Sequence, residues 1–161
     1  YFAGHSDGYL PVGSLFYRPM GAFVTLQKQG ALRGCIGTFE PDKPLYQVIQ
    51  EMAVAAAVHD NRFPAVQETE LTQLQIEISV LSPMRQITDP EAEIQVGHHG
   101  VYVKQGYRSG TYLPQVATDN DWDLETFMNS LCGQKAGLAP DVWQTGEAEI
   151  FIYDAQVFGE E

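Results

Sequence analysis

Two periodicities of apolar residues divide the chain into expected strands and helices. Apolar residues at every second position are typical of a half-buried strand, and apolar residues spaced by three and four are typical of an amphipathic helix. The first 20 residues show neither pattern and are punctuated by Gly and Pro, which indicates a loop. The later apolar and alternating segments predict strands over 22–26, 31–39, 74–81, 100–104, 108–113 and 147–157.

Two other segments carry an apolar stripe at helical spacing. The first spans 45–56, with Pro44 suited to the first helical position. It ends before Pro64, because the residue that precedes a proline is pushed out of the helical region. The second spans 124–132, with Asp123 as the candidate N-cap. Strands outnumber helices and are not regularly interleaved with them, so the pattern favours an α+β fold over a doubly wound parallel sheet.

Length and composition are those of a globular protein. The 161 residues fit one domain, or two small lobes that share a core, and the hydrophobic fraction of 44% excludes disorder across the whole chain. No apolar run approaches the roughly 20 residues of a membrane-spanning helix. No signal-peptide pattern is visible, and two cysteines are too few for a disulfide-stapled secreted scaffold. We therefore expect a cytoplasmic protein.

The charge excludes two classes of partner. Nine Lys and Arg residues stand against 21 Asp and Glu residues, which gives a net charge of −12 with the histidines neutral. Proteins that bind nucleic acid need a basic stripe that neutralises phosphates, and anionic lipid also attracts basic segments. We therefore expect neither nucleic-acid nor membrane binding.

The segment Leu32–Gly37 carries the strongest candidate chemistry. Cys35 lies between Gly34 and Gly37, where little side-chain bulk shields its sulfur. Arg33 is two residues earlier and shares a face with Cys35 if the segment is extended. A nearby cation favours the nucleophilic thiolate form of a cysteine. The alternative is that Cys35 is a small buried core residue, which is the commoner role of a free cysteine.

Two further sets of residues are candidates. The paired histidines His98 and His99 lie between glycines and offer a base, a proton donor or a metal ligand. No ligand pair in the chain has the spacing of a zinc site, and no Walker A or Rossmann fingerprint is present, so we expect no metal and no nucleotide cofactor. Arg33, Arg62 and Lys135 would form an anion site if they converged. The alternative is that each of them pairs with a surface carboxylate.

Seven sequence segments, which follow one another along the chain, make it resemble the AMME chromosomal-region candidate gene 1 protein family. The string Leu-Arg-Gly-Cys-Ile-Gly is close to diagnostic, and the resemblance extends from Gly21 to Phe158. It departs from the family pattern before Gly21, where family members have a helix-forming segment. The segments that carry the resemblance are 21–26, 32–37, 56–63, 78–83, 97–100, 113–117 and 135–138.

The resemblance implies a fold, a site and partners. The implied fold is a single α+β domain over 1–161, with an antiparallel sheet flanked by helices, a smaller second lobe and a cleft between the two. The implied partners are a Memo-like protein and a radical S-adenosylmethionine protein. The resemblance leaves the biochemical activity open. The site that it implies contains Arg33, Cys35, Asp60, Arg62, His99 and Lys135.

Two readings of this site are open. In the first, the protein is a thiol-dependent enzyme or binds a small anionic ligand at a site built around Cys35. Cys35 is then the nucleophile, Arg33 stabilises its thiolate, and His99 is a base or acid. Arg62 and Lys135 would bind the anion, with Asp60 orienting a cation. Gly34 and Gly37 belong to this ligand site as points of close backbone approach. In the second, the same glycines and charges serve packing and partner docking in a non-catalytic adaptor module. The sequence predicts neither a substrate nor an oligomeric state.

Overall fold

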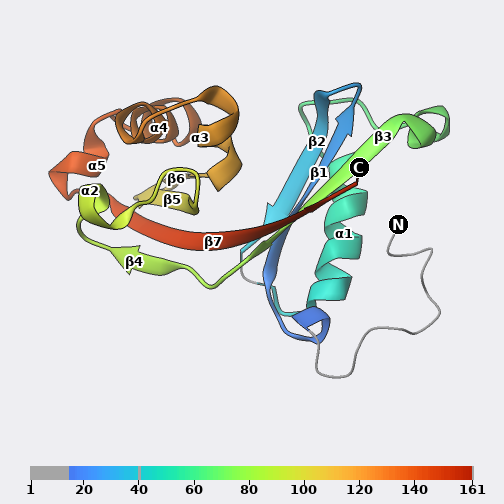
Figure 1. The fold of residues 1–161 in the computed structure, drawn as a ribbon, viewed down its shortest axis with the longest axis horizontal. Helices are drawn as coiled ribbons and strands as arrows, with labels where there is room; N and C mark the ends of the chain where they lie inside the picture. The colour runs from blue at the N-terminus through green and yellow to red at the C-terminus, as the bar shows by residue number, and fades with distance from the viewer. Residues whose placement is uncertain (1–14, 40, 161) are drawn as a thin grey trace. The chain divides into compact units, whose positions relative to one another are not determined.

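The computed structural model describes residues 15–39 and 41–160, which fall into two compact units. The described residues up to Ser82 form the first unit together with 156–160, and residues 83–155 form the second. Strand β7 (Glu149–Gly159) contributes residues to both units (Figure 1). Each unit has its own hydrophobic core.

The first unit is an antiparallel sheet covered by one long helix. β1 (Gly21–Lys28) pairs on one side with β2 (Ala31–Thr38) and on the other with β3 (Leu74–Leu81). The last residues of β7 follow β3 in the strand order. Helix α1 (Leu45–Val58) packs on β1 and β2. A short turn η2 (Leu15–Tyr17) precedes the sheet, and a longer 3-10 segment η3 (Glu68–Gln73) leads into β3.

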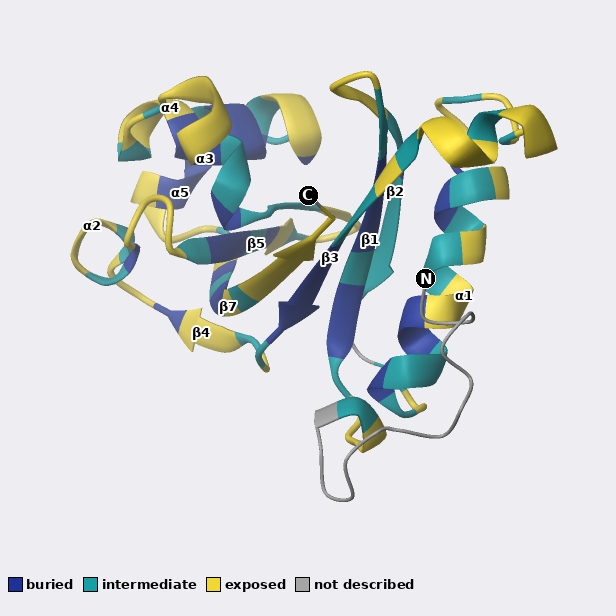
Figure 2. Cartoon of the chain, turned by 45° about the vertical axis from the view of Figure 1, so that its right-hand side comes forward, coloured by how far each residue is buried: buried dark blue, intermediate teal, exposed yellow. Residues whose placement is uncertain are grey.

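The core of the first unit follows from the two sequence periodicities. Alternate residues of β1 face the helix and are fully buried, and α1 turns its apolar stripe toward them. Figure 2 shows this division on α1, with buried residues along one side and exposed residues along the other. The buried members are Ala22, Val24, Leu26, Leu45, Val48, Ile49, Ala56, Ile78 and Val80.

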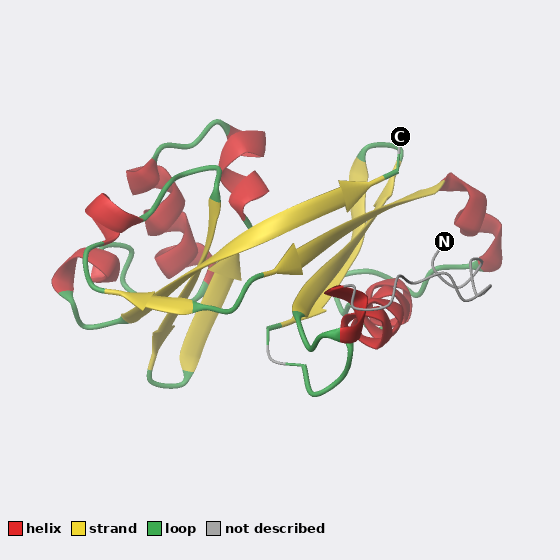
Figure 3. Cartoon of the chain, turned by 60° about the horizontal axis from the view of Figure 1, so that its bottom comes forward, coloured by secondary structure: helices red, strands yellow, loops and turns green. Residues whose placement is uncertain are grey.

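The second unit packs its helices against a separate set of antiparallel strands. Its strand order is β4 (Arg85–Ile87), β7, β5 (His99–Gln105) and β6 (Arg108–Tyr112). The helices gather beside these strands (Figure 3) and bury Phe127, Met128, Leu131 and Cys132 against them. They are α2 (Pro90–Glu93), α3 (Pro114–Asn120), α4 (Leu124–Ser130), the π-helical η4 (Leu131–Lys135) and α5 (Val142–Thr145).

The α+β class with antiparallel strands flanked by helices is confirmed. The predicted helix over 45–56 is α1, and the strands predicted over 100–104 and 108–113 are β5 and β6, which pair with each other. The predicted helix over 124–132 is also present, although its last turn is π-helical. Part of the predicted N-terminal loop lies outside the described residues. In the described ranges, none of the helices combines the length and apolar character that crossing a bilayer requires.

Candidate functional site

Cys35 lies on β2, and among the described residues β1 is the only strand that pairs with β2. Thr25 of β1 is its cross-strand partner, and the Thr25 Oγ1 to Cys35 Sγ distance is 3.2 Å. The backbone N–H of Cys35 donates to Asp60 Oδ2 at 3.0 Å, and its carbonyl accepts from Arg62 Nη2 at 3.4 Å. The turn that follows α1 therefore satisfies both polar backbone groups of Cys35. We call Thr25, Cys35, Asp60 and Arg62 the edge cluster.

Asp60 is the centre of the edge cluster. Its side chain is only 4% exposed, and it accepts four hydrogen bonds. Two come from backbone N–H groups, those of Cys35 and Arg62, and two come from the Arg62 guanidinium, with Arg62 Nη2 at 2.7 Å from Oδ2. The Arg62 side chain, followed by these backbone donors, holds the pKa of Asp60 far below its ordinary value despite burial. Asp60 is thus a fixed anion at this position.

Arg62 is the solvent-facing partner of this pair. Its side chain is 51% exposed, in contrast to the buried Asp60 carboxylate. The hydrogen bonds that the Arg62 guanidinium donates to Asp60 raise the pKa of Arg62 above its ordinary value. The guanidinium also lies 5.5 Å from the centre of the Phe63 ring. An anion that approached from solvent would therefore meet the guanidinium before the carboxylate.

The two glycines beside Cys35 are explained by close packing. A Cβ added to Gly34 would lie 2.1 Å from the carbonyl oxygen of Ala56, so a side chain here would push α1 away from β2. A Cβ added to Gly37 would lie 2.3 Å from the Phe23 ring. Such distances are far inside van der Waals contact, so both positions require glycine for packing alone.

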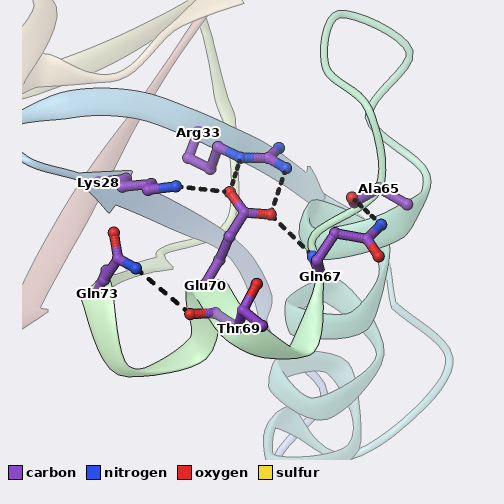
Figure 4. A network of polar contacts seen from close by, with 7 residues as sticks. All are labelled: Lys28, Arg33, Ala65, Gln67, Thr69, Glu70 and Gln73. Atoms are coloured by element: carbon purple, nitrogen blue, oxygen red, sulfur yellow. Dashed lines mark hydrogen bonds and ion pairs between the residues drawn. The ribbon is translucent and has the colours of Figure 1, made fainter.

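Arg33 is held by a carboxylate, and its predicted stabilisation of the Cys35 thiolate stays a prediction. Its Nε and Nη2 donate to the two oxygens of Glu70 at 3.1 Å each, and Lys28 Nζ donates to Glu70 Oε1 at 3.0 Å (Figure 4). Glu70 also accepts from the backbone N–H of Gln67, which completes a capping box at the start of η3. These donors, Arg33 first, lower the pKa of Glu70 to about 2. The charge of Arg33 is therefore balanced within the first unit.

His99, the predicted acid or base, lies at the start of β5 in the second unit. Its Nδ1 accepts from the backbone N–H of Gln95 at 3.0 Å, and its Nε2 lies 3.8 Å from Asp154 Oδ1. His98 Nε2 is 3.1 Å from the same oxygen. Burial, together with the charge of His98, lowers the pKa of His99. Both ring nitrogens of His99 thus face groups of the second unit.

Lys135, the predicted second cation of the anion site, ends η4 in the second unit and is exposed. The aliphatic part of its side chain lies over Gly110 of β6. Its convergence with Arg33 and Arg62 stays a prediction, as does the contribution of His99 to the Cys35 site. The structure brings together Cys35, Asp60 and Arg62, which belong to one unit.

Sequence reasoning missed three members of these arrangements. Glu70 follows Gln67 by three residues, and this capping spacing was its one local signal. Thr25 and Asp154 had none, because strand pairing alone places them opposite Cys35 and His99. Cys132 is fully buried, as predicted, and burial raises its pKa to about 11. Neither Cys35 nor Cys132 forms a disulfide bond.

Comparison with known proteins gives matches along nearly the whole chain. The AMMECR1 family model matches residues 5–158. A protein from Methanosarcina acetivorans is 42% identical over 161 residues, covering 98% of this chain and 80% of that protein. A protein from Methanopyrus kandleri is 44% identical over 149 residues, covering 88% and 72%. The crystal structure of an uncharacterized protein from Pyrococcus horikoshii superposes with a TM-score of 0.84 at 41% identity, covering 91% of this chain and 76% of that one.

Proposed function

The chain belongs to the AMMECR1 family, and from this premise we propose that it binds a small anionic molecule at the edge cluster, where the Cys35 thiol reacts with it. One observation carries the proposal. The buried Asp60 carboxylate fixes the half-exposed Arg62 guanidinium at the backbone of a half-buried cysteine. A positioned guanidinium binds a carboxylate or phosphate group through short, charge-assisted hydrogen bonds.

Each residue of the edge cluster has a defined part in this proposal. Arg62 receives the anionic group, Asp60 orients Arg62, and Cys35 supplies the nucleophilic sulfur. Thr25 Oγ1 lies within hydrogen-bond distance of that sulfur and orients it. In the second unit, His99 is proposed as an acid or base and Lys135 as a further cation, and both roles come from the family resemblance. Arg33 supports β2 through Glu70.

Alkylation with two reagents of different charge tests the proposal. The measured quantity is the ratio of the Cys35 alkylation rate with anionic iodoacetate to the rate with neutral iodoacetamide. We expect this ratio to be higher in the folded protein than in the urea-unfolded chain. The Arg62→Gln variant should lower this ratio roughly 2- to 5-fold, the effect of up to about 1 kcal/mol between partly exposed charges. The fully buried Cys132 is an internal reference, because it should stay unlabelled until the protein unfolds.

Two further variants control this experiment. Arg62→Lys keeps the charge and should keep most of the anionic preference. Arg85→Gln removes an equally charged side chain that pairs with Glu93 in the second unit, and it should leave the ratio unchanged. An identical ratio in the wild type and in folded Arg62→Gln would refute the anion site. A Cys35 that resists both reagents in the folded protein would refute the reactive thiol.

The adaptor reading is favoured by a different observation. Gly34 and Gly37 are each required by packing, and all four hydrogen bonds of Asp60 are made within the first unit. In that case the domain works by binding partners, for which the family resemblance implies Memo-like and radical S-adenosylmethionine proteins. Two results together would favour the adaptor. Cys35 would be unreactive toward both alkylating reagents, and the domain would co-purify with either protein equally well as wild type and as Cys35→Ser.

A further inference from the structure

A cluster of three chemically active side chains lies in the second unit, and the proposed function draws on only one of them, His99. His98 and His99 enter β5 directly after Gly97, and Asp154 lies opposite His99 on β7. His98 Nε2 is 3.1 Å from Asp154 Oδ1, and His99 Nε2 is 3.8 Å from that oxygen. All three candidate ligand atoms lie within 4.8 Å of one another.

The local backbone explains why two adjacent histidines reach the same carboxylate. Gly97 adopts a φ of +84°, a left-handed conformation that favours glycine and turns the chain sharply into β5. The backbone N–H groups of His98 and His99 both donate to the Gln95 carbonyl, which tightens this turn. The two rings then meet edge to face, with 4.9 Å between their centres.

We propose that His98, His99 and Asp154 bind one divalent metal ion such as Zn²⁺. Two imidazole nitrogens and one carboxylate oxygen are a donor set that suits such ions. Metal–ligand bonds of 2.0–2.2 Å to a tetrahedral ion separate neighbouring ligand atoms by about 3.4 Å, and the observed separations of 3.1 and 3.8 Å bracket this value. The two histidine nitrogens lie within 4.8 Å of each other, and side-chain movement that brings them toward the same value closes the site.

Exposure and charge also fit an open metal site. The side chains of His98 and Asp154 are 63% and 61% exposed, so water can fill the remaining coordination positions. Arg85, whose charge acts on His99, donates to Glu93 at 3.2 Å, and this pairing balances its charge. Such a site has three protein ligands and open positions, an arrangement more typical of catalytic than of structural zinc.

Metal binding requires a proton rearrangement at both histidines. His98 Nε2 lies 3.1 Å from the Asp154 carboxylate and donates its proton to it in the metal-free protein, so on loading this proton moves to Nδ1 of the His98 ring or to water, and Nε2 forms the bond to the metal. At His99 the same change also affects a backbone contact. The Gln95 amide donates to Nδ1, so in the metal-free protein the ring proton is on Nε2. On loading, the Nε2–H bond breaks, the proton moves to Nδ1, and Nε2 forms the bond to the metal. The Gln95 amide loses its acceptor, and water can replace it because Gln95 is exposed.

Calorimetric titration of the whole chain with zinc chloride tests the site. We expect one zinc ion per chain, with the dissociation constant raised at least about 10-fold in Asp154→Asn and in His98→Gln, since even outer-shell changes cause losses of this size. Both side chains are more than half exposed, so both variants should fold. Zinc should also raise the melting temperature of the wild type and not that of Asp154→Asn.

Two variants outside the cluster are the controls. His59→Gln removes an exposed histidine at the end of α1, and Cys35→Ser removes the thiol of the edge cluster. Neither should change the zinc affinity, and retained binding in Cys35→Ser separates this site from the proposed thiol function. Absence of saturable binding, equal binding in Asp154→Asn, or loss of binding in either control would overturn the metal site.

Discussion

At the residue scale, a single buried carboxylate organises the edge cluster. Asp60 accepts from the backbone of Cys35 and from the backbone and guanidinium of Arg62. A buried charge is tolerated when it is paired and its lone pairs are satisfied, and both conditions hold here. Asp60 also accepts from the backbone N–H of Cys35 on the outer side of β2. Without this bond, that N–H would be part of an unpaired strand edge.

Replacing this carboxylate should weaken the fold measurably. Asp60→Asn removes the charge and turns one acceptor into a donor that faces N–H groups. We expect the free energy of unfolding to fall by about 1.5–3 kcal/mol, the range for a hydrogen bond to a charged group. Urea unfolding followed by circular dichroism measures the change. The exposed Asp119→Asn is the control and should shift stability by no more than about 0.5 kcal/mol.

The pH dependence of stability should change in the same variant. The folded pKa of Asp60 lies below its ordinary value, so its stabilising contribution is complete above about pH 5 and is lost as the pH falls toward the folded pKa. The unfolding free energy of Asp60→Asn should therefore decline less steeply between about pH 5 and 2 than that of the wild type. Parallel curves for the two proteins would contradict the assigned role of Asp60.

At the element scale, the approach of α1 to β2 sets the position of Cys35. The helix lies so close to the strand that Ala56 occupies the space a side chain at Gly34 would need. The apolar stripe of α1 then buries Val48 and Ile49 against β1. Gly34 of the motif is therefore required for the packing of α1 on β2.

A methyl group at Gly34 should disrupt this contact. We expect Gly34→Ala to destabilise the protein by about 3 kcal/mol, the upper part of the usual range for overpacking, because a backbone oxygen and not a flexible side chain blocks the space. Thermal and urea unfolding midpoints measure the loss. Gly159→Ala in β7 is the matched control, since nothing lies within 4 Å of its added Cβ. Similar stability for the two variants would contradict the packing explanation.

At the scale of the whole molecule, the net charge of −12 governs which partners approach. The cations Lys28 and Arg33 are bound to Glu70, and Arg62 is bound to Asp60, so they form no basic stripe. An acidic surface repels polyanions at long range and lowers their association rate. A small anion is a different case, because one well-placed guanidinium suffices to bind it.

We expect the protein to bind neither DNA nor RNA at physiological salt. The chain lacks the excess of cations that releases counterions from a phosphate backbone. Electrophoretic mobility of labelled single- and double-stranded probes measures this, with a basic nucleic-acid-binding protein as the positive control. Retardation that weakens as salt is raised would refute the prediction.

The sequence alone determined the elements whose periodicity extends over several turns or several residue pairs. The stripe from Leu45 to Ala56 predicted α1, and the alternation around Ile78 predicted β3, because burial of one face imposes a local repeat. Seven segments along the chain, among which the motif around Cys35 is close to diagnostic, indicated the family, and the comparisons confirm it. Four-residue helices such as α2 and α5 were missed, since one turn carries too little periodicity.

Only the tertiary structure decided which distant side chains meet. Strand register places Thr25 opposite Cys35 and Asp154 opposite His99, and a shift of one residue would turn each side chain to the other face. The sequence predicted that Arg33 shares a face with the thiol, and it contained no sign that the fold of η3 brings Glu70 to bind Arg33. Local patterns record which face of an element is buried, but contacts between elements depend on how the chain closes its loops, and no local repeat encodes that.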